Sequence, residues 1–191
     1  MSQNQSYGGA VWIDAVPQLT GANIPFVIRL RVVLLRDTGA PLAPFNAWQI
    51  IQGLETVGLR MKQHCANAEK VVTFLETQKK VTNVIYPTNH QGEIKERALK
   101  YMKGGYGSLV GMDVGTKENG AKFIDNLKML YHVANIGDAR SLAIHPATTT
   151  HSQLNEKELL AAGVTPGYVR LSIGIEHPDD IIADIKQALA A

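Results

Sequence analysis

The feature that most constrains this chain is a run of apolar side chains at helical spacing from about Asn46 to Gln78. They recur at intervals of three and four residues, and polar side chains occupy the opposite face. A helix of this length extends roughly 50 Å at 1.5 Å per residue, more than a small globule needs. We therefore predict a spine joining two bodies, one of them mostly absent from this chain, with close packing or a bend near Gly53 and Gly58. The apolar positions are Ala47, Ile50, Ile51, Leu54, Val57, Met61, Cys65, Ala68, Val71, Val72 and Leu75.

Beyond residue 80 the sequence alternates between short strand patterns and helical patterns. The last predicted helix begins at Pro178, with two aspartates placed against the positive end of its dipole. This order predicts an α/β fold in which helices cover one side of a small sheet. Strands are expected near 81–86, 108–114, 131–134, 142–145 and 169–175, and helices near 94–102, 118–130, 156–162 and 179–190.

The first 25 residues carry only weak patterns. Residues 10–13, Ala-Val-Trp-Ile, predict a short strand. The Ser-Tyr-Gly-Gly sequence at 6–9 predicts a turn before it.

Composition excludes several classes of protein. The 191 residues are 45% hydrophobic and 19% charged, enough for one domain or for one domain plus a piece of another. The net charge of +2 is scattered along the chain, so nucleic acid is not expected as a partner. The single Cys65 excludes a disulfide framework, and residues 1–9 lack the apolar run of a secretory signal. The longest uncharged stretch, 39–54, is too short for a bilayer, so we expect a soluble, cytoplasmic protein without a membrane partner.

The strand pattern at 168–176 places Val169, Leu171 and Ile173 on one face and Arg170 on the other, beside small and polar residues. A guanidinium in such surroundings can bind a carboxylate through two hydrogen bonds. An arginine on the solvent side of a half-buried strand gives the same pattern. The pattern alone favours this second interpretation.

A turn is expected at 135–141, between two predicted strands. Its Asn135 and Gly137 can present backbone N–H groups to an anion. A turn closed by the Asn135 side chain without any ligand is the alternative, and the residues alone favour it.

The remaining candidates give no catalytic centre. The spacing between His145 and His151 matches no standard pair of metal ligands, so no metal is expected. The neighbouring His64 and Cys65 fall in the long helical run with Cys65 on its apolar face, which favours a place in the core over a nucleophile. Residues 104–107 are rich in glycine but precede a strand, unlike a phosphate-binding loop. The residues taken alone therefore indicate a surface that binds a small anion and carries no catalytic group.

Several motifs together resemble the Cys/Met-metabolism family of pyridoxal-phosphate enzymes, and within it most closely the O-acetylhomoserine sulfhydrylases. In these enzymes an Asn precedes a Gly-Asp-Ala turn, as Asn135 does here. The resemblance covers almost the whole chain, and its last segments are highly specific. The segments are 29–39, 44–47, 52–56, 59–61, 135–139, 141–147, 150–151 and 169–176.

The resemblance implies the C-terminal part of a fold-type I transferase. Residues 1–45 would be a remnant of the large cofactor domain, 46–78 the long linking helix, and 79–191 the small C-terminal domain with a mainly antiparallel sheet. The family's substrate is an amino acid, and the resemblance implies that Arg170 binds its α-carboxylate with help from Asn135. Ser141 and Thr150 would shape the pocket.

One departure concerns the catalytic lysine of the family. The turn at 6–9 resembles the glycine turn that lies about ten residues after that lysine. The chain would therefore contain half of a pyridoxal-phosphate site, with no catalytic residue of its own. We expect the whole enzyme to transfer an aminocarboxypropyl group to a sulfur nucleophile in methionine or cysteine synthesis, and the isolated chain to be inactive. Expected partners are further copies of the chain or a missing N-terminal half; a non-catalytic remnant or dimerisation module is the alternative.

Overall fold

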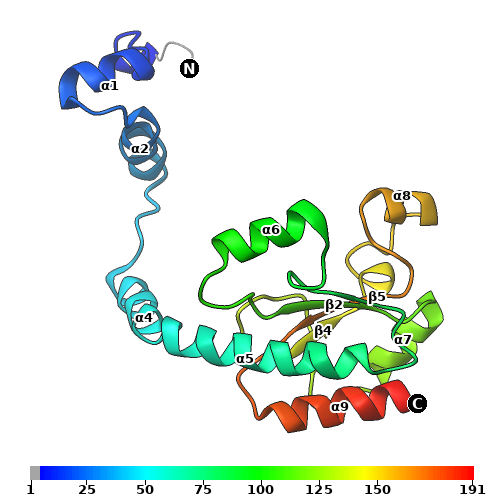
Figure 1. Cartoon of the computed structure of the whole chain (residues 1–191). Helices are drawn as coiled ribbons and strands as arrows, with labels where there is room; N and C mark the ends of the chain where they lie inside the picture. The colour runs from blue at the N-terminus through cyan, green and yellow to red at the C-terminus, as the bar shows by residue number, and fades with distance from the viewer. Residues whose placement is uncertain (1–4) are drawn as a thin grey trace. The chain divides into compact units, whose positions relative to one another are not determined.

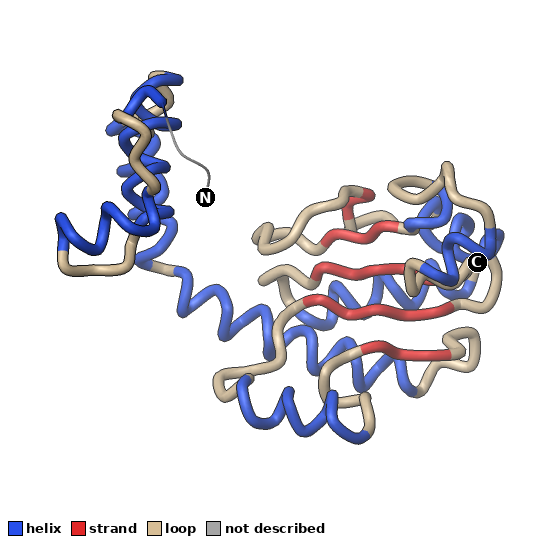
Figure 2. Tube along the Cα trace, turned by 90° about the horizontal axis from the view of Figure 1, so that it is seen from above, coloured by secondary structure: helices blue, strands red, loops and turns tan. Residues whose placement is uncertain are grey.

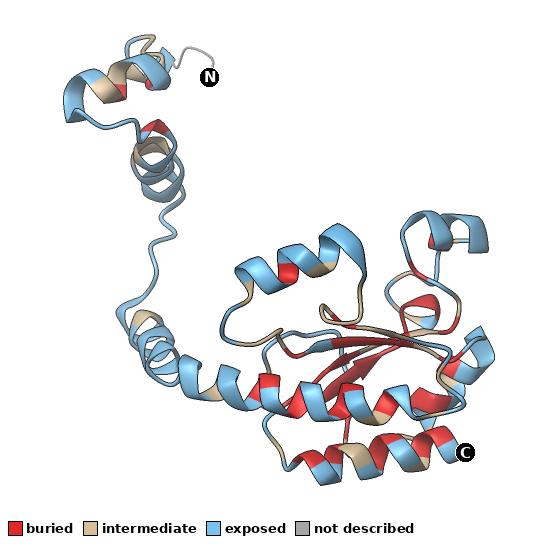
Figure 3. Cartoon of the chain, viewed as in Figure 1, coloured by how far each residue is buried: buried red, intermediate tan, exposed pale blue. Residues whose placement is uncertain are grey.

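The computed structural model describes residues 5–191, which divide into two compact units, the first ending at Leu54 and the second spanning 55–191 (Figure 1). The first unit is helical and the second contains the sheet. Buried residues lie mainly in the second unit, on the sheet and on the helix faces that meet it (Figure 3).

Short helices make up the first unit. They are η1 (Gln5–Tyr7), α1 (Trp12–Thr20), α2 (Pro25–Arg29), the π-helical η2 (Leu30–Leu35), α3 (Arg36–Thr38) and α4 (Pro44–Glu55), which ends at the unit boundary. Within residues 5–191, no single helix is long and apolar enough to cross a bilayer. One pair of helical segments, Trp12–Thr20 and Pro25–Thr38, has the necessary length and composition together, but the two are bent by 101° relative to each other.

The strand predicted at 10–13 is wrong, because Trp12 begins helix α1. Trp12 and Val16, one helical turn apart, are the buried residues of this helix, and the Trp12 ring meets Tyr7 edge-on at 5.0 Å between centroids. Four residues were too short a window to separate strand from helix. The turn is confirmed at Gly8 and Gly9, whose positive φ angles favour glycine.

The single helix predicted over 46–78 is two helices, α4 and α5 (Val57–Glu76). They are separated at Thr56, which leaves the helical conformation with ψ near 3°. Gly53 and Gly58 flank this point, and each lowers helix stability by about 1 kcal/mol relative to alanine. The helical backbone is therefore interrupted between the two glycines named from the sequence. The two helices also differ in burial, because α5 is buried from His64 onwards whereas none of the twelve described residues of α4 is buried.

The sheet of the second unit has the order β1-β2-β5-β4-β3 (Figure 2). Its strands are β1 (Asn83–Ile85), β2 (Leu109–Asp113), β3 (Tyr131–His132), β4 (Leu142–Ile144) and β5 (Tyr168–Ser172). Pairing is antiparallel except between β3 and β4. The prediction of a mainly antiparallel sheet is confirmed, and each strand lies at its predicted place, shortened at one or both ends.

Helices lie on both faces of this sheet. On one face pack α5, α7 (Lys117–Asp125) and α9 (Pro178–Ala190), whose apolar side chains form the core with Val110, Met112, Val169, Leu171 and Ile173. Helix α6 (Gly92–Tyr101) lies over the opposite face (Figure 1), which the sequence had left uncovered. Two shorter helices, η3 (Pro146–Thr148) and α8 (Glu156–Ala161), follow β4.

Candidate functional site

Arg170 occupies the centre of β5, between Gly111 of β2 and Ile144 of β4. Val169 and Leu171 on either side of it are fully buried in the core, so Arg170 projects from the opposite face. The alternation read from the sequence is confirmed. The core packing of its two neighbours fixes the direction in which the guanidinium leaves the sheet.

The guanidinium of Arg170 is incompletely paired. Its Nη2 donates to the main-chain carbonyl of Asn135 at 3.4 Å, at an exposed position. Its Nε is buried and has no hydrogen-bond partner among the described residues. The Nη atoms carry N–H donors beyond the one bound to Asn135, so the guanidinium can bind a further acceptor such as a carboxylate. An acceptor from solvent reaches the Nη side, because Nε is closed to solvent.

A cavity of about 510 Å³ lies beside Arg170, between the sheet and α6. Its volume is in the range of small-molecule sites. Helix α6 contributes Ile94, Arg97, Ala98 and Tyr101, and the sheet contributes Tyr168 and Arg170. Arg97 forms an exposed ion pair with Glu93 one turn earlier, whereas Arg170 has no carboxylate partner among the described residues. The cavity therefore joins an apolar wall to one unneutralised cation, a combination that fits a small organic acid.

The two tyrosines that line the cavity, Tyr86 and Tyr168, add no negative charge to it. Burial raises the pKa of Tyr168 above its ordinary value, although the charge of Arg170 acts in the opposite direction. Burial also raises the pKa of Tyr86, helped by the charge of Glu69, and its hydroxyl donates to the Gly107 carbonyl at 2.9 Å. Both phenols are neutral near pH 7, so neither competes with a carboxylate for Arg170.

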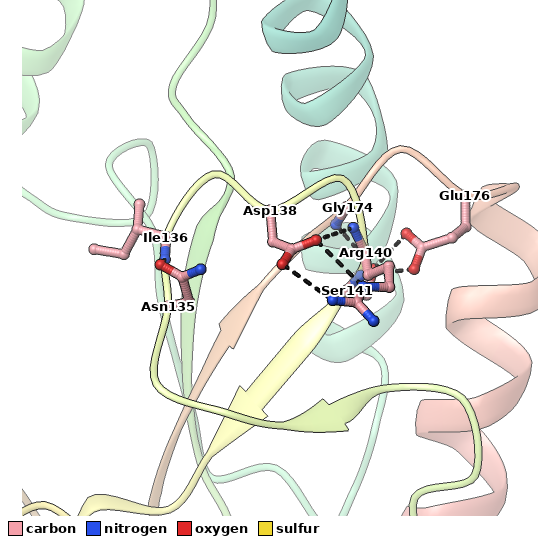
Figure 4. A network of polar contacts seen from close by, with 7 residues as sticks. All are labelled: Asn135, Ile136, Asp138, Arg140, Ser141, Gly174 and Glu176. Carbon is pink, nitrogen blue, oxygen red and sulfur yellow. Dashed lines mark hydrogen bonds and ion pairs between the residues drawn. The ribbon is translucent and has the colours of Figure 1, made fainter. Parts of the chain in front are cut away.

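Asn135 contacts Arg170 with its main-chain carbonyl and not with its side chain. The carbonyl of Asn135 accepts a hydrogen bond from the Ser172 hydroxyl at 2.8 Å as well as the bond from Arg170. Its side-chain oxygen accepts from the N–H of Ile136 at 2.8 Å (Figure 4). This bond joins neighbouring residues and does not close the turn. The bond typical of an Asx turn is made by Asp138, whose side chain accepts from the Arg140 N–H at 3.0 Å (Figure 4). The Asn135 carbonyl holds the guanidinium.

Ser141 and Thr150 lie elsewhere. Ser141 is completely buried at the start of β4, where its N–H and hydroxyl donate to the Glu176 carboxylate at 2.6 and 2.9 Å (Figure 4). Thr150 is exposed after η3, with its hydroxyl 2.9 Å from Nδ1 of His151. Neither lines the cavity beside Arg170 as the described residues form it.

His64, His145 and Cys65 are buried in the second unit. His145 lies between the Thr148 hydroxyl and the Pro166 carbonyl, and its burial lowers its pKa. Cys65 is buried, as expected. Among the described residues, no group of three His, Cys, Asp or Glu could hold a metal ion.

The sequence did not indicate two parts of this region. One is the wall formed by α6, whose residues Ile94, Ala98 and Tyr101 recur at helical spacing and line the cavity. The other is Glu176, whose contacts join segments 35 residues apart and leave no signal in local periodicity.

The cavity does not by itself fit pyridoxal phosphate. None of its lining residues, as the structure describes them, is a lysine that could bond to the cofactor's aldehyde carbon. The cavity can bind and orient a carboxylate through Arg170, and the groups for covalent chemistry would have to come from outside it.

Comparison with known proteins agrees with this partial site. Residues 4–190 match the family model described as Cys/Met metabolism PLP-dependent enzyme. The chain is 50% identical over 171 residues to an O-acetyl-L-homoserine sulfhydrylase of Leptospira meyeri, covering 88% of this chain and 39% of that protein. It is 38% identical over 195 residues to a homocysteine/cysteine synthase of Saccharomyces cerevisiae, covering 96% and 43%.

A solved structure extends the likeness to the fold. A Campylobacter jejuni protein described as an O-acetylhomoserine (thiol)-lyase, which carries a pyridoxyl-lysine monophosphate, superposes with a TM-score of 0.85 and 41% identity. It covers 100% of this chain, and this chain covers 44% of it. The chain therefore spans between 39% and 44% of the length of these three proteins. Since the match to the family model runs over nearly its full length, the chain belongs to the Cys/Met-metabolism PLP-dependent enzymes.

Proposed function

We propose that this chain is the C-terminal portion of an O-acetylhomoserine sulfhydrylase, and that Arg170 binds the α-carboxylate of its amino-acid substrate. The complete enzyme transfers the aminocarboxypropyl group to a sulfur nucleophile and releases acetate. The observation that carries the proposal is the incompletely paired guanidinium of Arg170 at a cavity of small-molecule size. The names of the relatives supply the reaction class.

The roles of the chain's own residues follow from their contacts. Arg170 neutralises the carboxylate, and the Asn135 carbonyl restricts the rotation of the guanidinium through its bond to Nη2. The apolar side of the cavity, including Ile94 and Ala98 of α6, contributes no charge that would compete with the carboxylate for Arg170. Ser141 does not line the cavity; it shapes the pocket indirectly, by fixing one end of the turn at 135–141 to Glu176. Thr150 contacts His151, and this contact supports no role at Arg170.

The chain alone is inactive under this proposal, because pyridoxal phosphate supplies the electron withdrawal for the reaction and the cavity has no lysine to hold it. The alternative is a non-catalytic remnant or a dimerisation module. The exposed apolar residues of α4 favour that alternative, since a surface of this kind is typical of an interface. Self-association and a cytoplasmic location belong to both proposals.

A chimera tests the function. The full chain replaces the segment of the Leptospira meyeri sulfhydrylase that it matches, and homocysteine formation is followed with O-acetylhomoserine, sulfide and pyridoxal phosphate. We expect an active chimera in which Arg170→Ala lowers kcat/KM about a hundredfold, mostly through KM, because a charge-assisted pair worth about 3 kcal/mol is lost. Lys186→Ala, an exposed cation of α9, is the matched control and should leave both constants unchanged.

Two results would count against the proposal. If the chimera is active and Arg170→Ala leaves KM as it was, Arg170 does not bind the carboxylate. If the chimera folds with native helix content but has no activity, the non-catalytic alternative is favoured.

A further inference from the structure

The four residues that follow β5, Ile173 to Glu176, connect this strand to α5 and to the turn at 135–141. The carbonyl of Ile173 faces Nδ1 of His64 at 2.6 Å, and the carbonyls of Gly174 and Glu176 accept from the Asn67 side chain at 3.0 and 2.8 Å. His64 and Asn67 are both buried in α5. The backbone of this segment is therefore fixed to α5 on one side.

On its other side the segment holds the turn that contains Asn135. The two oxygens of the Glu176 carboxylate accept from the N–H and the hydroxyl of Ser141, and that hydroxyl accepts from the Gly174 N–H at 2.8 Å (Figure 4). The N–H of Ile175 donates to the Ala139 carbonyl at 2.8 Å. Ser141 is completely buried, and the half-buried Glu176 carboxylate accepts both of its donors.

The contact between Glu176 and Ser141 depends on the glycine at position 174. A Cβ at this position would collide with the Glu176 carboxylate and lie 2.5 Å from the Ala139 carbonyl oxygen. The φ of Gly174 is not in the left-handed region, so space and not backbone conformation requires glycine here. The Glu176 side chain can reach Ser141 only because residue 174 has no side chain.

The two ends of the turn are thus attached to β5 and to its continuation. Its first residue, Asn135, receives hydrogen bonds from Ser172 and Arg170, and its last, Ser141, is held by Glu176. A turn fixed at both ends places the Asn135 carbonyl, and through it the Arg170 guanidinium, at a set position. Loss of the Glu176 carboxylate would leave two buried donors of Ser141 without an acceptor and release one end.

We propose that Glu176 is a positioning residue for the carboxylate anchor: through Ser141 it sets the place of the Asn135 carbonyl beside Arg170. This inference rests on the proposed function only for the statement that Arg170 binds substrate. The contact between Glu176 and the turn, and its effect on the Arg170 side chain, stand apart from that statement.

The test uses the full chain labelled with ¹⁵N and compares NMR spectra of the wild type and Glu176→Ala. We expect the amide of Asn135 and the side-chain Nε–H signal of Arg170 to move, and the exchange rate of the Ser141 amide with solvent to rise about tenfold or more. Ser141→Ala, which keeps the backbone bond to Glu176, should move the same signals in the same direction by less. Glu118→Gln, an exposed carboxylate of α7, is the control.

A purely structural role for Glu176 would change the Ser141 amide and leave the Arg170 side-chain signal in place, and that result overturns the proposal. If Glu176→Ala does not fold, the displacement in Ser141→Ala decides in the same way. The chimera separates the two claims. If Arg170→Ala leaves the KM of the active chimera as it was, yet the Arg170 signal of the chain moves in Glu176→Ala, the proposed function is overturned and the positioning role is supported.

Discussion

At the scale of single residues, the buried carboxylate of Asp184 is a second acid, after the half-buried Glu176, that organises this unit. It lies on α9 and accepts the backbone N–H groups of Lys128, Met129 and Leu130 at 2.9 to 3.0 Å. Gln187 donates to it as well, at 3.0 Å. Burial acts to raise the pKa of Asp184, but these hydrogen bonds outweigh it and lower the pKa below its ordinary value. The ionised carboxylate therefore ties the segment before β3 to α9.

We predict that Asp184→Asn lowers the free energy of unfolding by about 2 kcal/mol at pH 7. Because the folded-state pKa of Asp184 is depressed, its stabilisation is present above the pKa of the unfolded chain, about 4, and is lost as the pH falls through the folded-state pKa. Urea denaturation at pH 7, 5 and 3 should show the difference between wild type and variant shrinking at the lowest pH. The exposed Asp125→Asn is the control, and a difference independent of pH would contradict the assignment.

Two helical glycines give a second residue-scale prediction with opposite signs. A Cβ at Gly120 of α7 would overlap the buried imidazole of His145, lying 2.6 Å from its Cδ2, whereas a Cβ at Gly58 of α5 meets nothing within 4 Å. We expect Gly120→Ala to destabilise the chain by about 2 kcal/mol or more and Gly58→Ala to stabilise it by up to about 1 kcal/mol. Thermal denaturation of both variants checks this. Stabilisation by Gly120→Ala would show that the imidazole can move aside.

The sequence predicted residues whose place depends on local alternation, and it failed where contacts are long-range. Arg170 could be assigned to the polar face of its strand because its neighbours in sequence alternate with it. Glu176 could not be assigned, because its partner Ser141 is distant in sequence and becomes a neighbour only when β4 and β5 pair. Thr150 was chosen through the family resemblance, and the fold leaves it exposed beside His151.

At the scale of elements, the predictions after residue 80 succeeded better than the prediction of one long helix. The strands and helices after residue 80 have strong patterns with glycine or proline at their ends, and the structure confirms their order. The long helix was overextended because periodicity continues through Thr56, although the backbone leaves the helix there. Helix α6 was found from the sequence, but its place over the Arg170 face depends on packing that no local pattern encodes.

At the scale of the whole molecule, the first unit presents an unusual amount of apolar surface. Phe45, Trp48, Ile51 and Leu54 of α4 are each more than half exposed, and the rings of Phe45 and Trp48 lie 5.8 Å apart. A helix with such a surface is normally covered in a soluble protein. The chain spans only 39% to 44% of the length of its relatives.

The isolated chain should nevertheless associate with itself, because no other surface is available to cover these residues in a pure sample. We predict a sedimentation mass above 20.8 kDa that rises with concentration. Replacing Ile51 with lysine should move the distribution toward the monomer, since burying a charge in an apolar contact opposes association. Leu160→Lys changes an equally exposed leucine of α8 in the second unit and should leave the distribution unchanged. A wild-type chain that remains monomeric at all concentrations would show that α4 needs no cover, and the dimerisation alternative would lose its support.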